Sequence, residues 1–192
     1  MAQNPNNLIM GPAQVYLGAF GTSTEPADAA VNLAPAASGG WTEVGLTDGG
    51  VSMTITPKFT DFNADQIVDT PGTRLTSRTI VVATTMSEVT LANLANALNS
   101  TVGATGANFA TFEPNFGQFA SQLPYAAVIL DGWAPSTSGQ NFRRRVILRK
   151  TMQTSKVDLN YAKDKQLGLS VTWQAYFVSN TVAPYHLVDQ VS

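Results

Sequence analysis

The stretch that decides the fold is residues 41–99, WTEVGLTDGGVSMTITPKFTDFNADQIVDTPGTRLTSRTIVVATTMSEVTLANLANALN. In residues 51–56 apolar side chains alternate with hydroxyl side chains, which predicts a strand with one apolar and one hydroxyl face. Residues 77–86 are dense in β-branched side chains and predict a second strand. Between them, residues 59–74 are rich in Asp, Asn, Thr and Gly, which predicts a long arm formed as a β-hairpin. An exposed strand edge readily pairs with another chain, so strands and a long arm of this kind are unfavourable in a lone subunit. The pattern therefore indicates a subunit whose arm contacts neighbouring subunits.

One short helix is predicted at residues 90–98. Its apolar side chains recur at i, i+3, i+4 and i+7, in Leu91, Leu94, Ala95 and Leu98. Thr90 stands where an N-cap belongs. A helix of this length is not stable alone in water, so we expect it to pack on a sheet with its apolar stripe inward.

The rest of the chain is organised as strands separated by loops. Further strands are predicted at residues 13–20, 41–46, 125–133, 142–154 and 168–179, and long loops at residues 21–40 and 100–122. About seven strands and one helix in 192 residues predict a single mainly β domain over residues 1–192, a β-sandwich or barrel.

The composition excludes several classes of protein. There is no Cys, so disulfides and thiolate ligands are absent, and the net charge of −2 argues against tight nucleic-acid binding. Charged residues make up 12%, about half the usual share. The longest apolar run, residues 125–130, is too short to span a membrane, and the first residues lack the pattern of a secretory leader. We therefore expect a soluble protein made in the cytoplasm, with no membrane partner.

The residues that usually carry catalysis are missing. His186 is the only histidine, and we interpret it as a surface or tail residue rather than a ligand or base. No nucleophile elbow, phosphate-binding loop or dinucleotide fingerprint is present. Asp61, Asp65 and Asp69 do not have the spacing of a calcium loop, so we interpret them as solvated or partner-contacting carboxylates. We predict no catalytic, cofactor-binding or metal residues, no cofactor, and a protein that is not an enzyme.

The only basic cluster is in residues 143–150. Strand alternation places Arg143, Arg145 and Arg149 on one face and Arg144 and Lys150 on the other, which splits the cluster and weakens a nucleic-acid interpretation. Ion pairing between subunits is the favoured interpretation for the three arginines on one face. Plain solvation and contact with DNA stay open.

Four phenylalanines in the second long loop form another group: Phe109, Phe112, Phe116 and Phe119. Pro114 and Gly117 interrupt any helix that could carry them. We expect the loop to fold these rings onto the core, with docking on a neighbouring subunit as the alternative.

A family resemblance emerges from the order of these features. The patterns are W-x-E-V-G-x-T-x-G at residues 41–49, V-x-M-x-I-x-P at 51–57, F-x-D-x-x-x-D-Q at 59–66 and R-T-I-V-V at 78–82, followed by the helix. Together they resemble the major tail tube protein of a long, non-contractile-tailed bacteriophage. The resemblance is strongest over residues 41–99, about a third of the chain.

The resemblance implies a subunit that closes into a six-membered ring with one continuous β-barrel, and rings that stack into a tail tube for genome delivery. The implied partners are other copies of this chain, a tail tape-measure protein, and tail terminator and tip proteins, with DNA only as passing cargo. The implied location is the virion tail, assembled in the host cytoplasm. Contacts between subunits are expected from the arm residues Phe59, Asp61, Phe62, Asp65, Gln66, Asp69 and Arg74.

A wall that lets DNA pass should offer phosphates no cations. The candidates for that wall are Thr54, Thr79, Thr85, Thr172 and Gln174. If each of six subunits gives about four strands, the barrel circumference is on the order of 150 Å, which leaves room for a duplex.

Three alternatives stay open. One is the tube ring of a contractile or secretion system. Another is a monomeric carbohydrate-binding β-sandwich, which would need exposed Trp rings, whereas Trp41 and Trp173 fall on apolar faces of predicted strands. The third, an enzyme, is the least favoured.

Overall fold

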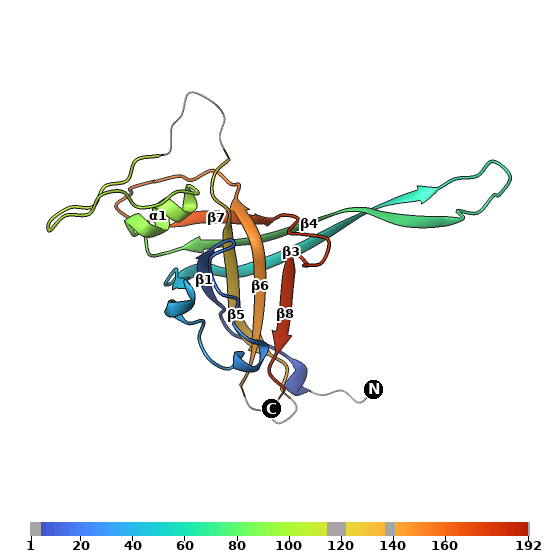
Figure 1. Cartoon of the computed structure of the whole chain (residues 1–192), viewed down its shortest axis with the longest axis horizontal. Coiled ribbons are helices and arrows are strands. Elements are labelled where there is room, and N and C mark those ends of the chain that lie inside the picture. The colour runs from blue at the N-terminus through green and yellow to red at the C-terminus, as the bar shows by residue number, and fades with distance from the viewer. Residues whose placement is uncertain (1–4, 115–121, 137–140, 192) are drawn as a thin grey trace.

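The architecture is mainly β, with 43% strand and 9% helix in a computed structural model that describes residues 5–114, 122–136 and 141–191. In those residues eight strands form one antiparallel sheet that is not closed. The mainly β class is confirmed, and the expected sandwich or barrel takes the form of one bent, open sheet. Figure 1 shows β1, β5, β6 and β8 running across the direction of β3, β4 and β7.

The strands pair in the order β2-β1-β5-β6-β7-β4-β3, and β8 pairs with β6. Their bounds are β1 Gln14–Ala19, β2 Thr42–Glu43, β3 Thr47–Phe62, β4 Gly72–Met86, β5 Ala126–Ala134, β6 Phe142–Gln153, β7 Leu169–Ala175 and β8 Tyr185–Asp189. Short 3-10 turns lie at Pro5–Asn7, Asp28–Ala30 and Ala37–Gly39. Seven of these strands overlap predicted ones, and β8 was not predicted.

The bend of the sheet lies in β6. The first part of this strand pairs with β8, from Arg144 opposite Asp189 to Leu148 opposite Tyr185. Its last residues pair with β7, where Gln153 lies opposite Trp173. Between the two parts β6 carries one extra residue relative to β5, and such a bulge bends and twists a strand. One strand therefore belongs to both halves of the sheet.

The predicted arm is a hairpin that protrudes far from the body (Figure 1). β3 and β4 pair from Thr47 opposite Met86 out to Phe62 opposite Gly72, so residues 59–62 and 72–74 are strand and residues 63–71 form the connecting tip. Gly49 and Gly50 have φ of 72° and 81° at a register shift near the base, a conformation that glycine adopts without strain.

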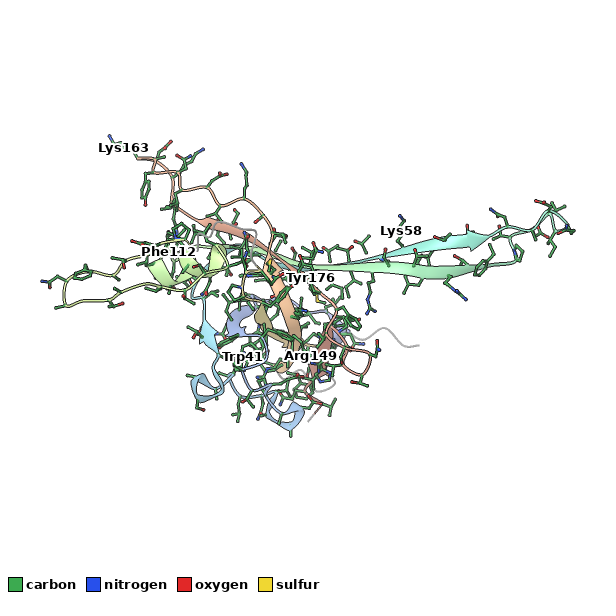
Figure 2. All side chains as sticks on the ribbon, turned by 45° about the horizontal axis from the view of Figure 1, so that its top comes forward. Trp41, Lys58, Phe112, Arg149, Lys163 and Tyr176 are labelled. Carbon is green, nitrogen blue, oxygen red and sulfur yellow. The ribbon has the colours of Figure 1, made fainter. Side chains whose placement is uncertain are left out.

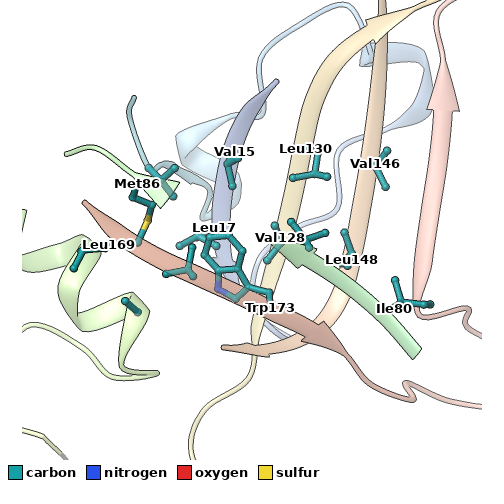
Figure 3. Packing of buried hydrophobic residues seen from close by; sticks show 14 residues of the cluster. Val15, Leu17, Ile80, Met86, Val128, Leu130, Val146, Leu148, Leu169 and Trp173 are labelled. Atoms are coloured by element: carbon teal, nitrogen blue, oxygen red, sulfur yellow. The ribbon is translucent and has the colours of Figure 1, made fainter. Parts of the chain in front are cut away.

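The main core lies between the two halves of the sheet. Figure 3 shows side chains from β1, β4, β5, β6 and β7 converging around Trp173, which is 1% exposed. Burying each large apolar side chain contributes about 1.5–3 kcal/mol. A smaller cluster on the other face of β1, β5 and β6 contains Tyr16, Trp41, Ala127, Ile129 and Ile147. Burial of Trp41 and Trp173 confirms their expected places on apolar faces.

The predicted helix is present as α1, Leu91–Ala97. The Thr90 side chain accepts a hydrogen bond from the Asn93 backbone N–H at 3.1 Å, which confirms the cap. The predicted stripe is right for Ala95, which is buried, and for Leu94, which packs against the core, but Leu98 is 40% exposed. Leu98 lies outside the stripe because the helix ends at Ala97.

Candidate functional site

The five predicted wall residues come together on one face of β3, β4 and β7. Pairing places Thr54 opposite Val81, and Val81 opposite Gln174. Thr79 lies opposite Thr56, and Thr172 opposite Ala83. The hydroxyl oxygens of Thr85 and Ser170 are 3.2 Å apart across the β4–β7 pair. We define the hydroxyl face as Ser52, Thr54, Thr56, Thr79, Val81, Ala83, Thr85, Ser170, Thr172 and Gln174.

The hydroxyl face is uncharged and open. Thr54 and Thr79 are exposed, and Thr172 and Gln174 are half-buried. Charged residues adjoin it at its ends along β3, where Asp48 pairs with Thr85 and Lys58 pairs with Ser77. They also adjoin it beside Ser170 and Thr172, where Lys156, Asp158 and Lys165 line the same hollow. The opposite side of the same strands carries the core, so the three strands separate an apolar interior from a neutral polar surface.

The arm also has two different faces. Strand alternation places Ile55, Pro57 and Phe59 on the side that carries the core in the body, and Phe59 lies opposite Leu75. We call these four residues the apolar arm face. Ile55, Phe59 and Leu75 are 42%, 56% and 49% exposed. The side of β3 and β4 that packs into the core thus continues outward along the arm. At the base of the arm Arg78 lies opposite Pro57 and its guanidinium is 5.6 Å from the centre of the Tyr185 ring, and beyond it Phe59 and Leu75 are about half exposed.

The other arm residues predicted to contact neighbours are all exposed: Asp61, Phe62, Asp65, Gln66, Asp69 and Arg74. The guanidinium of Arg74 lies 5.5 Å from the centre of the Phe62 ring. The structure adds Ile67 and Val68 near the tip, which are 54% and 105% exposed. Sequence reasoning missed both because they lie in a polar segment without strand alternation.

The arginines have acidic partners within the chain. Asp131 contacts both Arg143, at 3.2 Å, and Arg145, at 3.3 Å. Arg149 binds Glu25 with two hydrogen bonds of 2.7 and 2.8 Å. Pairing between subunits is wrong for Arg145, which is 1% exposed and thus inaccessible. For Arg143 and Arg149 it stays a prediction, although each already has a partner.

These cations also fasten the predicted 21–40 loop to the sheet. The Arg145 guanidinium donates to the backbone carbonyls of Ala30, Val31 and Leu33. Together with the Arg149–Glu25 pair, it holds residues 25–33 over the second core cluster. His186 lies in β8 and not in a tail, and its Nε2 is 2.9 Å from Asp28 of the same loop.

Arg144 faces the other way and pairs with Asp189 on β8 through two contacts of 2.6 Å. The hydrogen bonds that Arg144 donates to the Asp189 carboxylate raise the pKa of the Arg144 guanidinium. This pair joins two neighbouring strands and leaves Arg144 on the opposite face from Arg145, as alternation predicted.

A cavity of about 360 Å³ lies between α1 and the ends of β1 and β5. Its lining is mostly apolar and includes Leu17, Ala92, Ala95, Val102, Tyr125 and Trp173. We call it the α1 cavity. None of its lining residues is charged, so it suits an apolar group rather than a charged ligand.

In the second long loop, Phe109 is 62% exposed and Phe112 is half-buried. The expected packing of Phe109 onto the core is therefore wrong. Phe116 and Phe119 lie outside the described residues.

Metal ligands and membrane-spanning helices are the remaining features to consider in the part of the chain that the structure describes. Among those residues no three His, Asp or Glu side chains cluster closely enough to hold a metal ion. The same residues contain no helix long and apolar enough to cross a membrane. Comparison with protein-family models and with curated proteins found no match for this chain.

Proposed function

We propose that this chain is a structural subunit that polymerises into stacked rings, each of six copies, to form the tail tube of a long-tailed bacteriophage. The tube is a conduit for the genome, with DNA as passing cargo. The observation that carries the proposal is the arm, whose apolar face is bare in the single chain. An exposed apolar face on a long hairpin indicates a surface that another protein covers.

The hydroxyl face supports the conduit. The side chains of the hydroxyl face itself are short and neutral and give phosphates no cationic partner, which favours passage of DNA over retention. Lys58, Lys156 and Lys165 lie at its margin. With the end of β6, these strands make the four per subunit that a ring-shaped barrel of about 150 Å circumference needs.

The open edge of the sheet supports ring formation. β3 is the last strand in the pairing order and has a neighbour, β4, on one side only among the described strands. A sixteen-residue edge strand is a template for pairing with another chain. Closure of six copies into one barrel would pair this edge in every subunit.

The remaining assignments follow from the same proposal. Partners are other copies of the chain, a tape-measure protein inside the tube, and terminator and tip proteins at its ends. The protein acts in the virion tail after assembly in the host cytoplasm and is not an enzyme. A carbohydrate-binding module is disfavoured because Trp41 and Trp173 are buried and Arg143 covers the Trp133 ring at 5.2 Å.

Removal of the arm tests the proposal. Lys58 and Ser77 are paired across the hairpin, so residues 59–76 can be replaced by an Asn-Gly turn that joins these two residues. We expect this variant to stay folded and monomeric, whereas the unmodified protein forms rings or tubes in electron microscopy. Normal tubes from the shortened variant would contradict the role of the arm. An unmodified protein that stays monomeric at every concentration would contradict the proposed function.

A further inference from the structure

We propose that the apolar arm face of one copy docks into the α1 cavity of a neighbouring copy. The inference rests on the proposed function and names the two surfaces that meet. The side chains that enter are Phe59 and Leu75, which lie directly opposite each other on the arm.

The two surfaces lie at opposite ends of the molecule. Figure 1 shows the arm extending to one side of the body and α1 lying on the other. In Figure 2, Lys58 marks the arm, and Phe112 and Lys163 lie at the far end. The arm therefore points away from the cavity of its own chain, and only another copy can bring the two together.

Both surfaces lie on the same side of the β3–β4–β7 strands. The apolar arm face continues the side of β3 and β4 that packs into the core. On β7 the same side carries Trp173, which also lines the α1 cavity. A neighbouring copy can therefore present its arm to the α1 cavity from the core side of these strands, which leaves the hydroxyl face uncovered.

The chemistry of the two surfaces matches. The cavity volume of about 360 Å³ accommodates side chains of this size. Its wall on α1 consists of Ala92 and Ala95, which allow close approach, and Asn96. Phe59 is 56% exposed and Leu75 is 49% exposed, so both have apolar surface to bury. Docking would remove no charged group of the cavity from water, because none of the residues that line the cavity is charged.

A contact between two different surfaces is heterologous and propagates from copy to copy. Each chain has one arm and one α1 cavity, so a closed ring satisfies both in every subunit. A contact between identical surfaces would instead stop at a dimer.

Engineered cysteines test the inference, because the natural chain has none. A Phe59→Cys chain is mixed with an Ala92→Cys chain under assembly conditions and oxidised with copper phenanthroline, which accepts the two electrons released as two thiols form one disulfide. We expect dimers that contain one chain of each kind. A chain with both substitutions should give a ladder of covalent oligomers. The matched control replaces Phe59→Cys by Thr60→Cys, whose side chain lies on the other face of the arm.

Non-covalent variants complete the test. Phe59→Asp and the cavity-filling Ala92→Trp should each raise the protein concentration needed for assembly by about tenfold or more. Thr60→Asp and Leu98→Trp, at exposed sites off the two surfaces, should leave it unchanged. If the unmodified protein assembles but the Phe59→Cys and Ala92→Cys chains cross-link no more often than the control pair, the docking inference is wrong and the proposed function stands. If the unmodified protein does not assemble, both are wrong.

Discussion

At the scale of one residue, Asp131 shows how a buried carboxylate pairs with two arginines in this chain. Its side chain is fully buried in β5 and lies opposite Arg145, and it holds both Arg145 and Arg143. A buried charge is tolerated when it is paired, and removal of one partner leaves the other uncompensated. Arg145 in turn donates hydrogen bonds to the backbone carbonyls of Ala30 and Val31, which fixes the position of the 25–33 segment.

Asp131→Asn should therefore lower the free energy of unfolding by about 3–5 kcal/mol. Thermal or denaturant unfolding measures it. Asp189→Asn is the control, because it breaks the half-exposed pair with Arg144 and should cost about 0–1 kcal/mol. Equal losses in the two variants would show that Asp131 does not have this role.

Part of this arrangement of charged residues was predictable from the sequence. Alternation correctly placed Arg143 and Arg145 on one face and Arg144 on the other. It could not find their partners, because an ion pair such as Arg149–Glu25 joins residues 124 positions apart and no local pattern records it.

At the scale of elements, α1 shows how a helix of seven residues is retained. The Asn93 side chain donates to the carbonyls of Val44 and Glu88, at 2.8 Å each. Beyond its C-terminus, the Asn99 side chain accepts from the Gln153 N–H at 2.9 Å and donates to the Gln153 carbonyl at 2.8 Å. Side-chain amides thus fasten the helix at both ends, where its apolar stripe is too short to do so alone.

Two substitutions of Asn99 separate the contributions of its side-chain hydrogen bonds and of its backbone conformation to stability. Asn99 has φ of 51°, which glycine adopts freely. Asn99→Gly should lower the free energy of unfolding by about 1–3 kcal/mol through the lost hydrogen bonds to Gln153. Asn99→Ala should be less stable than the glycine variant by about 1 kcal/mol, because alanine disfavours this conformation. Denaturant titration compares them, and an alanine variant as stable as the glycine variant would contradict the explanation.

The elements were predictable where their pattern is local. The period of two in residues 51–56 and the cap at Thr90 identified a strand and a helix correctly. The extent of the arm was not predictable, because Pro57 interrupts the pattern and the pairing of Phe59 with Leu75 depends on a bulge at Thr76. β8 was missed because it is five residues long and follows Pro184.

At the scale of the whole molecule, the sheet order differs from the chain order. β1 pairs with β5, and β4 pairs with β7. The sequence predicted which side of each strand is polar, but not that Thr54, Thr79, Thr85, Thr172 and Gln174 would share one surface, since that depends on register between distant strands. The mainly β class was predictable, whereas the single bent sheet depends on the bulge in β6. That this surface lines a lumen stays a prediction.

Lysines on the hydroxyl face test the conduit. The triple variant Thr54→Lys, Thr172→Lys and Gln174→Lys should still assemble, because these side chains point away from the core. Its tubes should retain duplex DNA in a salt-dependent way, with a log–log slope of about −0.9 for each phosphate contacted. Filter binding across a salt series measures retention.

The control has the same added charge at exposed sites elsewhere: Thr22→Lys, Asn32→Lys and Asn180→Lys. If both triple variants hold DNA equally, the hydroxyl face has no special access to the duplex.

The pairing of β4 with β7 also has a consequence for biosynthesis. The hydroxyl face takes part of its residues from β3 and β4 and the rest from β7, and Thr85 and Ser170 meet across a separation of 85 positions. A nascent chain can form the β3–β4 hairpin early, since its contacts are local. The complete polar surface cannot exist until β7, which ends at Ala175, has been synthesised. Unfinished chains on a polysome that end before β7 therefore carry only the part of the hydroxyl face that lies on β3 and β4.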